Sequence, residues 1–327
     1  MEIKKFGLLP DGTEIFQYVL KTAEAEVRIL NFGGIITDFI YEGRNIVCGF
    51  DTLADYLTDT SYQGALIGRF ANRIGGASFT LNGKTYHIGA NEGKNSLHGG
   101  VLGFNRRVFD VQKADKNTLI LTRTSPDGEE GYPGNLALKV TYSLDGSSLT
   151  IHYNATSDAD TPISLTNHSY FNLAGIGTPV LDFDACINAD RYTAVDDDLI
   201  PTGERPLVAG TEYDLRTPRK IGEKVGGYDT NFVLNKIAED RSPTLAATVS
   251  SEDITLQIYT TQPCIQFYTG CVLEGTPDFR GGVKKALYTA FCLETQAEPD
   301  APRHGGAILR AGEAYDHTTV YHVTKRD

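Results

Sequence analysis

Alternation of apolar and polar residues with a period of two is the feature that most constrains the fold of this 327-residue chain. Apolar side chains occupy every second position from Leu136 to Leu144, and again from Leu149 to Ala155. Successive side chains of a β-strand point to opposite faces, so this period predicts strands with one apolar face. Asp145-Gly146 lies between the two segments, which predicts an antiparallel hairpin with a short loop.

The same pattern recurs along the chain. A second hairpin is expected around Asn82-Gly83, a pair that tolerates the positive φ angles of a type I′ turn. Further strands are expected at 26–31, 118–124 and 254–260, and short helical turns at 53–57 and 218–224. Thirty-four glycines suit many tight turns, and no repeat, linker or shift in composition marks a boundary. The sequence therefore predicts an all-β fold, a large antiparallel β-sandwich in which residues 1–327 form a single domain, with a ligand site on a concave sheet face or its loops.

Charge and cysteine usage exclude several functions. The formal charge of −12 makes nucleic acid, anionic lipid and heavily phosphorylated ligands poor partners, whereas a neutral ligand carries no such penalty. Five scattered cysteines without a CxxC pair argue against a disulfide framework and a zinc site, and fit a reducing compartment. The first residues lack the apolar stretch of a signal peptide, and no apolar run is long enough to span a membrane. We therefore expect a soluble, cytoplasmic protein.

His168 lies in the most polar of the candidate segments, Thr166-Asn167-His168-Ser169-Tyr170-Phe171-Asn172. Imidazole titrates near neutral pH and can donate or accept a proton there. Aromatic faces, amide groups and one acid–base group together suit a polyhydroxylated ligand. The alternative is a structural histidine with satisfied hydrogen bonds, and Tyr170 and Phe171 fit either a sugar platform or the core.

Four other clusters carry polar groups of the same kind. Asn72 and Arg73 fall within GRFANRI (68–74), where an arginine fork and an amide can clamp adjacent hydroxyls, or where Arg73 simply pairs with a carboxylate. His98 precedes two glycines in NSLHGG (95–100), which allows close approach of a ligand, although a loop histidine can be incidental. Asp229 in GYDTNF (227–232) can accept sugar hydroxyls or form an Asx turn. Gln266 in IQFYTG (265–270) completes the polar set.

Glu294 is the most persuasive carboxylate. It follows the apolar run Ala290-Phe291-Cys292-Leu293, so we expect it at the end of a buried strand. Burial disfavours the charged form of a carboxyl and raises its pKa toward the range useful for a general base. A buried glutamate can instead pair with Arg73.

Taken in order, the motifs resemble the aldose 1-epimerase (galactose mutarotase) family. GRFANRI, NSLHGG, SPDGEEGYPG (125–134), TNHSYFNLAG, LIPTGE (199–204), QFYTG and ETQ occur in the family's order across nearly the whole chain. The resemblance implies a β-sandwich of the supersandwich type and an isomerase that interconverts the α and β anomers of free aldoses such as galactose and glucose.

The resemblance also implies a role for each residue. Glu294 would be the general base at the C1 hydroxyl, His168 the general acid at the ring oxygen, and His98 an assisting group nearby. Asn72, Arg73, Asp229, Gln266 and Tyr170 would bind sugar hydroxyls. Ring opening and closure need neither redox chemistry nor a carbanion, so no cofactor and no metal are expected. The expected partner is a monosaccharide, with neither nucleic acid nor membrane involved, and the protein is expected to be a monomer or homodimer.

Some positions depart from the family pattern. Thr230 follows Asp229 where a histidine is frequent, Cys271 stands where asparagine is frequent, and Ala297-Glu298 follows ETQ in place of a histidine or aromatic pair. Phe109 stands where a tryptophan is usual. These changes bear on the preferred sugar more than on the reaction.

Three other functions remain open at this point. A hexose-6-phosphate 1-epimerase would need a basic cluster for the phosphate, for which only Arg106-Arg107 is available. A non-catalytic sugar-binding protein would have no need of both Glu294 and His168. A glycoside hydrolase would require two carboxylates flanking the scissile bond.

Overall fold

The computed structural model describes residues 2–235 and 242–326, and β-strands account for most of its regular structure. Its largest element is a nine-stranded sheet in the order β11-β12-β13-β14-β26-β22-β21-β17-β19. All ladders between the strands of this sheet are antiparallel. Its strands are β11 (Asp110–Ala114), β12 (Thr118–Ser125), β13 (Leu136–Asp145), β14 (Ser148–Ser157), β17 (Asp184–Ile187), β19 (Arg219–Lys220), β21 (Thr244–Ser250), β22 (Ile254–Thr260) and β26 (Ala314–Lys325).

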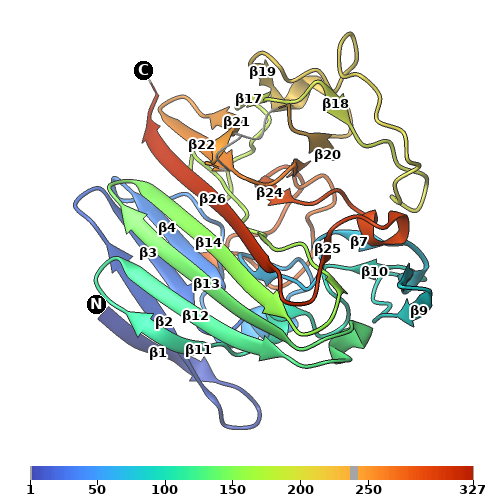
Figure 1. Ribbon diagram of the computed structural model, residues 1–327. Coiled ribbons are helices and arrows are strands. Elements are labelled where there is room, and N and C mark those ends of the chain that lie inside the picture. Colours follow the sequence, from blue (N-terminus) through green and yellow to red (C-terminus); the bar gives the residue numbers. More distant parts are fainter. Residues whose placement is uncertain (1, 236–241, 327) are drawn as a thin grey trace.

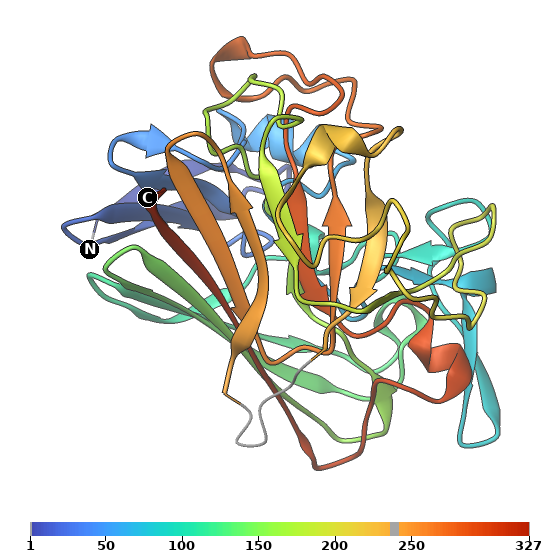
Figure 2. The same ribbon diagram turned by 90° about the horizontal axis from the view of Figure 1, so that it is seen from above.

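Two smaller sheets form the second layer. A five-stranded sheet has the order β1-β2-β3-β4-β5, and a four-stranded sheet has the order β18-β20-β23-β24. Figures 1 and 2 show the five strands near the N-terminus facing one half of the large sheet and the four strands facing the other half. Their bounds are β1 (Glu2–Leu8), β2 (Glu14–Lys21), β3 (Ala25–Leu30), β4 (Ile36–Tyr41) and β5 (Arg44–Asn45), then β18 (Arg191–Tyr192), β20 (Asp229–Val233), β23 (Cys264–Tyr268) and β24 (Cys292–Gln296).

Short elements fill the connections. One α-helix is described, α1 (Leu53–Thr58), and it begins at a capping box made by Thr52 and Asp55. The paired short strands are β6 (Leu66–Ile67) with β16 (Thr166–Asn167), β7 (Arg73–Ile74) with β10 (Ser96–Leu97), β8 (Ser78–Leu81) with β9 (Lys84–His87), and β15 (Thr161–Pro162) with β25 (Ile308–Leu309). Single 3₁₀ turns lie at Gly75–Ala77, Phe104–Arg106, Glu129–Gly131, Ile221–Glu223, Arg280–Gly282 and Ala301–His304.

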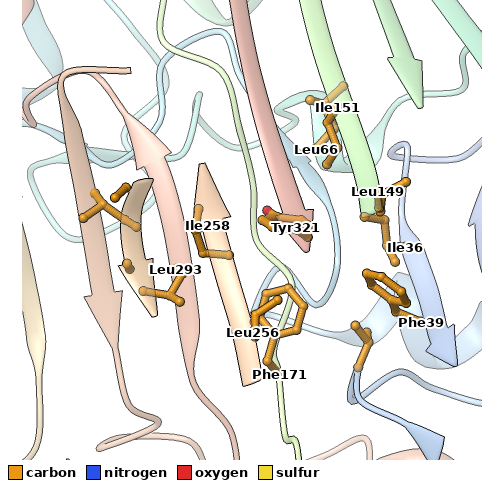
Figure 3. Close-up of a cluster of buried hydrophobic side chains, with 14 of the residues drawn as sticks. Ile36, Phe39, Leu66, Leu149, Ile151, Phe171, Leu256, Ile258, Leu293 and Tyr321 are labelled. Carbon is orange, nitrogen blue, oxygen red and sulfur yellow. The ribbon is translucent and has the colours of Figure 1, made fainter. Parts of the chain in front are cut away.

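One continuous core joins the two layers. Figure 3 shows Leu149 of the large sheet beside Ile36 and Phe39 of the five-stranded sheet and Ile151 beside Leu66, with Tyr321 of β26 between the two halves. Leu256 and Ile258 of β22 lie toward Leu293 of the four-stranded sheet in the same view. Each of these side chains is at least 99 % buried. The four-stranded sheet therefore gives one face to the core and leaves its other face for the site.

The structure confirms the predicted β-sandwich and most of its predicted elements. The expected hairpins are β13–β14 and β8–β9, and the expected strands at 26–31, 118–124 and 254–260 correspond to β3, β12 and β22. The helical turn predicted at 53–57 is α1, but the one predicted at 218–224 is wrong in part. Arg219–Lys220 extends the edge of the large sheet, and only Ile221–Glu223 forms a single 3₁₀ turn.

The structure also bears on the predictions about cysteines and membrane spans. All five cysteines are free thiols, as their scattered positions predicted. Among the described residues no helix is long and apolar enough to cross a membrane.

Candidate active site

The register of the four-stranded sheet places three polar side chains in one row. Asn231 of β20 is opposite Gln266 of β23, and Gln266 is opposite Glu294 of β24. Neighbours along these strands point the other way: Leu293 lies in the core, and Thr295 shares a hydrogen bond of 2.6 Å with Thr319 of the large sheet. The polar row therefore lies on the face of the sheet that is turned away from the core.

Glu294 is buried in this row, with 2 % of its surface exposed. Its Oε1 lies 3.6 Å from Nε2 of His168, and its Oε2 has no hydrogen-bond partner among the described residues. Burial, reinforced by the nearby Asp229 carboxylate and opposed by Arg73, raises the pKa of Glu294 well above its ordinary value. Glu294 was expected at the end of its strand; it is instead the central residue of β24.

His168 directly follows β16 and is held by its backbone. Its N–H donates to the carbonyl of Ala65 (2.8 Å), and its own carbonyl accepts from Gly64 (2.9 Å). The imidazole stacks on Tyr170, with ring centroids 5.1 Å apart, and its Nδ1 lies 3.6 Å from Sγ of Cys292. Burial lowers the pKa of His168 to about 4, so the free site favours the neutral imidazole.

His98 reaches the same site from the loop that follows β10. Its φ of +52° is unusual for a histidine, and Gly99 and Gly100 continue the left-handed backbone. A Cβ on Gly99 would lie 1.9 Å from the carbonyl oxygen of Gly68, so glycine is required for this close passage. Nδ1 of His98 accepts a hydrogen bond of 3.1 Å from the backbone N–H of Asn72. Burial lowers the pKa of His98 well below its ordinary value, with the neighbouring His168 and Arg73 acting in the same direction.

His98, His168 and Glu294 converge, with one side-chain N or O atom from each lying within 4.8 Å of the other two. Two histidines and a carboxylate can form a metal site, but the hydrogen bonding of His98 does not suit one. A neutral imidazole whose Nδ1 accepts a hydrogen bond carries its proton on Nε2, and a protonated nitrogen has no lone pair for a metal. The cluster is therefore arranged to exchange protons and hydrogen bonds with oxygen atoms.

A cleft of about 380 Å³ lies against the same sheet face. Asn72, Arg73, Asp229 and Gln266 line it, together with Thr230 and Cys271. Gln266 donates to Oδ1 of Asp229 across 2.6 Å, which leaves the second carboxylate oxygen of Asp229 available to a ligand. Burial raises the pKa of Asp229, while Arg73 and Gln266 oppose that shift. Such a mixture of amides, a carboxylate and a guanidinium suits a ligand with several hydroxyl groups.

Another cavity is larger, at about 690 Å³, but it lies beyond the end of β24. Ile163, Ile308 and Leu309 contribute to its walls, and none of the eight candidate site residues lines it. We assign the site by its convergent titratable groups and not by cavity size.

Eight site residues were predicted from the sequence. The structure brings seven of them together at this face of the sheet: Asn72, Arg73, His98, His168, Asp229, Gln266 and Glu294. The eighth, Tyr170, lies behind them. Tyr170 is 3 % exposed and packs within a buried cluster behind His168, so its ring supports the imidazole. Arg73 does not pair with Glu294, which was one of the alternatives. It makes a bidentate ion pair with Glu92, with both N–O distances 2.7 Å. This pairing agrees with the alternative that Arg73 has a carboxylate partner, and it fixes the guanidinium at the wall of the cleft.

Three contributors were missed from the sequence: Glu92, Cys292 and Tyr62. Tyr62 packs its ring against both imidazoles, at 4.7 Å from His98 and 6.0 Å from His168. Tyr62 and Glu92 stand in polar connecting segments and Cys292 in the apolar run before Glu294, and no local pattern marked any of the three as part of the site.

The fold and this acid–base cluster define the class of protein as an enzyme that moves protons in a hydroxyl-binding cleft. Comparison with known proteins agrees. Residues 17–322 match the model of the aldose 1-epimerase family. The human galactose mutarotase is 44 % identical over 97 % of this chain and 96 % of its own length. The aldose 1-epimerase of Escherichia coli K12 is 36 % identical over 96 % of this chain and 97 % of its own.

Solved structures give the same result. The galactose 1-epimerase of Lactobacillus acidophilus superimposes with a TM-score of 0.88 at 27 % identity, covering 100 % of this chain and 99 % of its own. An aldose epimerase homologue from C. elegans gives 0.89 at 26 % identity, over 95 % and 99 % of the two chains. The chain belongs to the aldose 1-epimerase family.

Proposed function

We propose that the protein is an aldose 1-epimerase that interconverts the α and β anomers of a free aldose such as galactose or glucose. The observation that carries this proposal is the buried contact between Glu294 and His168, 3.6 Å apart, beside a cleft lined by hydroxyl-binding groups. Relatives named galactose mutarotase and aldose 1-epimerase support it over nearly the full chain.

In the proposed reaction, Glu294 removes the proton of the C1 hydroxyl and His168 delivers a proton to the ring oxygen. The bond between C1 and the ring oxygen breaks, and its electron pair stays on the ring oxygen, which takes the proton from His168. An electron pair of the C1 oxygen forms the second bond of the aldehyde carbonyl, and rotation about C1–C2 precedes closure on either face. Closure reverses the proton transfers, so the enzyme recovers its starting state. No electron is gained or lost: Glu294 accepts one proton and His168 supplies one, so the sugar keeps the same number of protons.

The number of protons on the pair is central to this scheme. Burial raises the pKa of Glu294 and lowers that of His168, which favours a free pair with one proton, held by the carboxyl. The reactive form, carboxylate with imidazolium, holds the same single proton in a different place. We infer that the hydroxyls of a bound sugar stabilise this charged form, since they hydrogen-bond to both groups in the buried site.

Asn72, Arg73, Asp229 and Gln266 are proposed to hold the remaining hydroxyls of the sugar. His98 is proposed to donate from Nε2 to an oxygen at or near C1, because its Nδ1 already accepts from Asn72. With these contacts the proposed ligand of the site is a monosaccharide. From the sequence alone we also propose that the enzyme is a monomer or homodimer and that it acts in the cytoplasm.

A phosphorylated sugar is less well matched than a free one. Arg106 donates to the backbone carbonyls of Tyr56 and Leu57, and Arg107 pairs with Glu129 at 3.2 Å. Both arginines of the suggested basic cluster thus have partners within the protein. We therefore propose an unphosphorylated substrate.

Polarimetry of freshly dissolved α-D-galactose or α-D-glucose tests the function. The expected result is a rate above that of buffer and above that with D-glucose 6-phosphate at equal concentration. Mutarotation no faster than buffer across several aldoses would reject the proposal, and a preference for the phosphorylated sugar would favour the alternative epimerase.

A further inference from the structure

Tyr62 packs against both imidazoles of the site, which also contact each other. Its ring meets that of His98 edge-on, with centroids 4.7 Å apart and planes at 64°. Toward His168 the ring is more nearly parallel, at 6.0 Å and 28°. His98 and His168 themselves meet edge-on at 5.1 Å. Aromatic pairs at these separations and angles have a preferred geometry, so Tyr62 restricts the orientation of both imidazoles.

The loop that carries Tyr62 is held firmly on one side by Asp59. The carboxylate of Asp59 accepts from the backbone N–H of Gln63 (3.1 Å) and from Nζ of Lys285 (2.8 Å), in an ion pair whose two side chains are at least 96 % buried. The carbonyl of Tyr62 accepts from Ala65 (3.0 Å), the residue whose own carbonyl accepts from the backbone of His168. Tyr62 and His168 are thus joined by one short hydrogen-bonded backbone segment.

Asn91 links Tyr62 to the loop of His98. Nδ2 of Asn91 donates to Oη of Tyr62 (3.0 Å) and to the carbonyls of Leu97 (2.9 Å) and Gly100 (3.0 Å). Its Oδ1 accepts from the backbone N–H of Leu97 at 2.7 Å. Leu97 and Gly100 flank His98 and Gly99, so the same amide that holds the phenol also holds the histidine loop.

The hydroxyl of Tyr62 is left with a proton to donate. In the bond from Asn91 the phenol oxygen is the acceptor, and its O–H has no acceptor among the residues that the structure describes. Burial raises the pKa of Tyr62, with Glu92 acting in the same direction and Arg106 and Arg73 opposing it, so the phenol stays protonated at neutral pH. Asn91, which holds this hydroxyl, directly precedes Glu92, and Glu92 pairs with Arg73 at the wall of the cleft.

The backbone of Tyr62 is also held in an unusual conformation. Its φ of +58° lies in the left-handed region, which costs an aromatic residue free energy. Tyr62 is a half-buried residue on the loop between α1 and β6, and it also packs against the buried cluster that contains Tyr170. In this conformation its ring meets both imidazoles.

We propose that Tyr62 is a further substrate-contacting residue of the aldose site, whose hydroxyl donates to a sugar oxygen while its ring orients His98 and His168. This inference rests on the proposed function. The two roles are separable, because Tyr62→Phe removes only the hydroxyl, whereas Tyr62→Leu removes the aromatic face as well.

Polarimetry with D-galactose and D-glucose tests both roles. For Tyr62→Phe the expected result is a KM raised by about 2- to 10-fold, the range of one neutral hydrogen bond, with kcat within about twofold of the wild type. For Tyr62→Leu we expect a further fall of kcat by about 10-fold, because the imidazoles lose their orientation relative to the reacting atoms. Tyr86→Phe is the matched control: Tyr86 stacks on Phe79 in the β8–β9 hairpin, and its variant should retain both constants.

Each outcome bears on the inference. A KM for Tyr62→Phe equal to that of the wild type would overturn the sugar contact, and a kcat for Tyr62→Leu equal to that of Tyr62→Phe would overturn the orienting role. Where Tyr62→Leu fails to fold, as judged by its thermal transition, Tyr62→Phe still decides the contact. A wild-type protein that does not accelerate mutarotation at all would reject the proposed function and not the role of Tyr62 alone.

Discussion

The backbone N–H of Asn72 donates to Nδ1 of His98 across 3.1 Å, and this bond determines which nitrogen of the imidazole carries the proton. Since burial lowers the pKa of His98 well below its ordinary value, the ring is neutral at physiological pH and its proton resides on Nε2. His98 is thereby a hydrogen-bond donor toward the cluster that it shares with His168 and Glu294. A donor of this kind stabilises negative charge that develops on an oxygen during ring opening.

The tautomer of His98 can be measured directly. We expect ¹⁵N NMR of the imidazoles to show His98 protonated at Nε2 and unprotonated at Nδ1, with no titration between pH 5 and 8. His152 is a suitable internal reference, because it is partly exposed and pairs with Asp316 at the surface. A His98 signal that titrates near pH 6.5, or one protonated at Nδ1, would contradict the assignment of its role.

The pH dependence of turnover should reflect the pair of Glu294 and His168. Protonation of His168 in the free enzyme, with its pKa lowered to about 4, would place a second proton on the pair. We therefore expect kcat/KM, corrected for buffer-catalysed mutarotation, to stay flat from pH 7 down to 5 and to fall only on approach to pH 4. A decline centred near pH 6.5 would indicate an ordinary histidine and contradict the influence of burial.

Replacing Glu294 should separate activity from stability. Glu294→Gln removes the proposed base, so we expect kcat to fall by about 10² or more. The carboxyl has a raised pKa in the folded state and its ordinary value of about 4.5 in the unfolded state, so the folded protein binds this proton more tightly. The contribution of this carboxyl to the free energy of unfolding therefore falls as the pH rises above its pKa in the unfolded state, and it is lost once the pH exceeds its pKa in the folded state. Thermal transitions should show Glu294→Gln gaining stability over the wild type at pH 8, with a smaller difference at pH 4.5; an equal difference at both would contradict this.

Asp229 should affect binding more than chemistry. Gln266 holds its Oδ1, and Asp229 lines the cleft with its other oxygen available to accept from sugar hydroxyls. Loss of a hydrogen bond to a charged group costs about 1.5–3 kcal/mol, so we expect Asp229→Asn to lower kcat/KM by roughly 10- to 100-fold, mainly through KM. Asp253→Asn, which alters an exposed ion pair with Arg44, serves as the control and should leave both constants unchanged. A change in kcat alone would argue against a binding role for Asp229.

Much of the fold could be predicted from the sequence, because strands with one exposed face show an alternation of apolar and polar residues. β13 and β14 alternate between buried and exposed positions, so both strands and their hairpin were evident from Leu136 to Ala155. β24 carries no such signal, since all five of its residues are buried on both faces. Its position beside β23, which places Glu294 opposite Gln266, depends on pairing between distant segments and could not be derived from local pattern.

The site was predictable in its chemistry and not in its supports. His168 and His98 stand in segments rich in polar groups, Glu294 ends an apolar run, and the order of these segments resembles that of a known family. Tyr62 and Cys292 contact the same site, but their segments look like an ordinary connecting loop and an ordinary core strand. Their roles depend on which rings and atoms meet in space, and a single sequence holds no record of that.

Asn72 offers a last test, because its backbone and its side chain serve the site in different ways. Its φ of +67° is tolerated by asparagine and glycine but strained in alanine, and its Oδ1 accepts from the N–H of Arg73 at 2.8 Å. Asn72→Gly and Asn72→Ala both remove the proposed sugar contact, so we expect each to lower kcat/KM by about 10-fold. Only Asn72→Ala should add backbone strain, which lowers its stability below that of Asn72→Gly by about 1 kcal/mol in denaturant unfolding. A wild-type kcat/KM in Asn72→Gly would mean that the backbone N–H bound to His98 is the whole contribution of this residue.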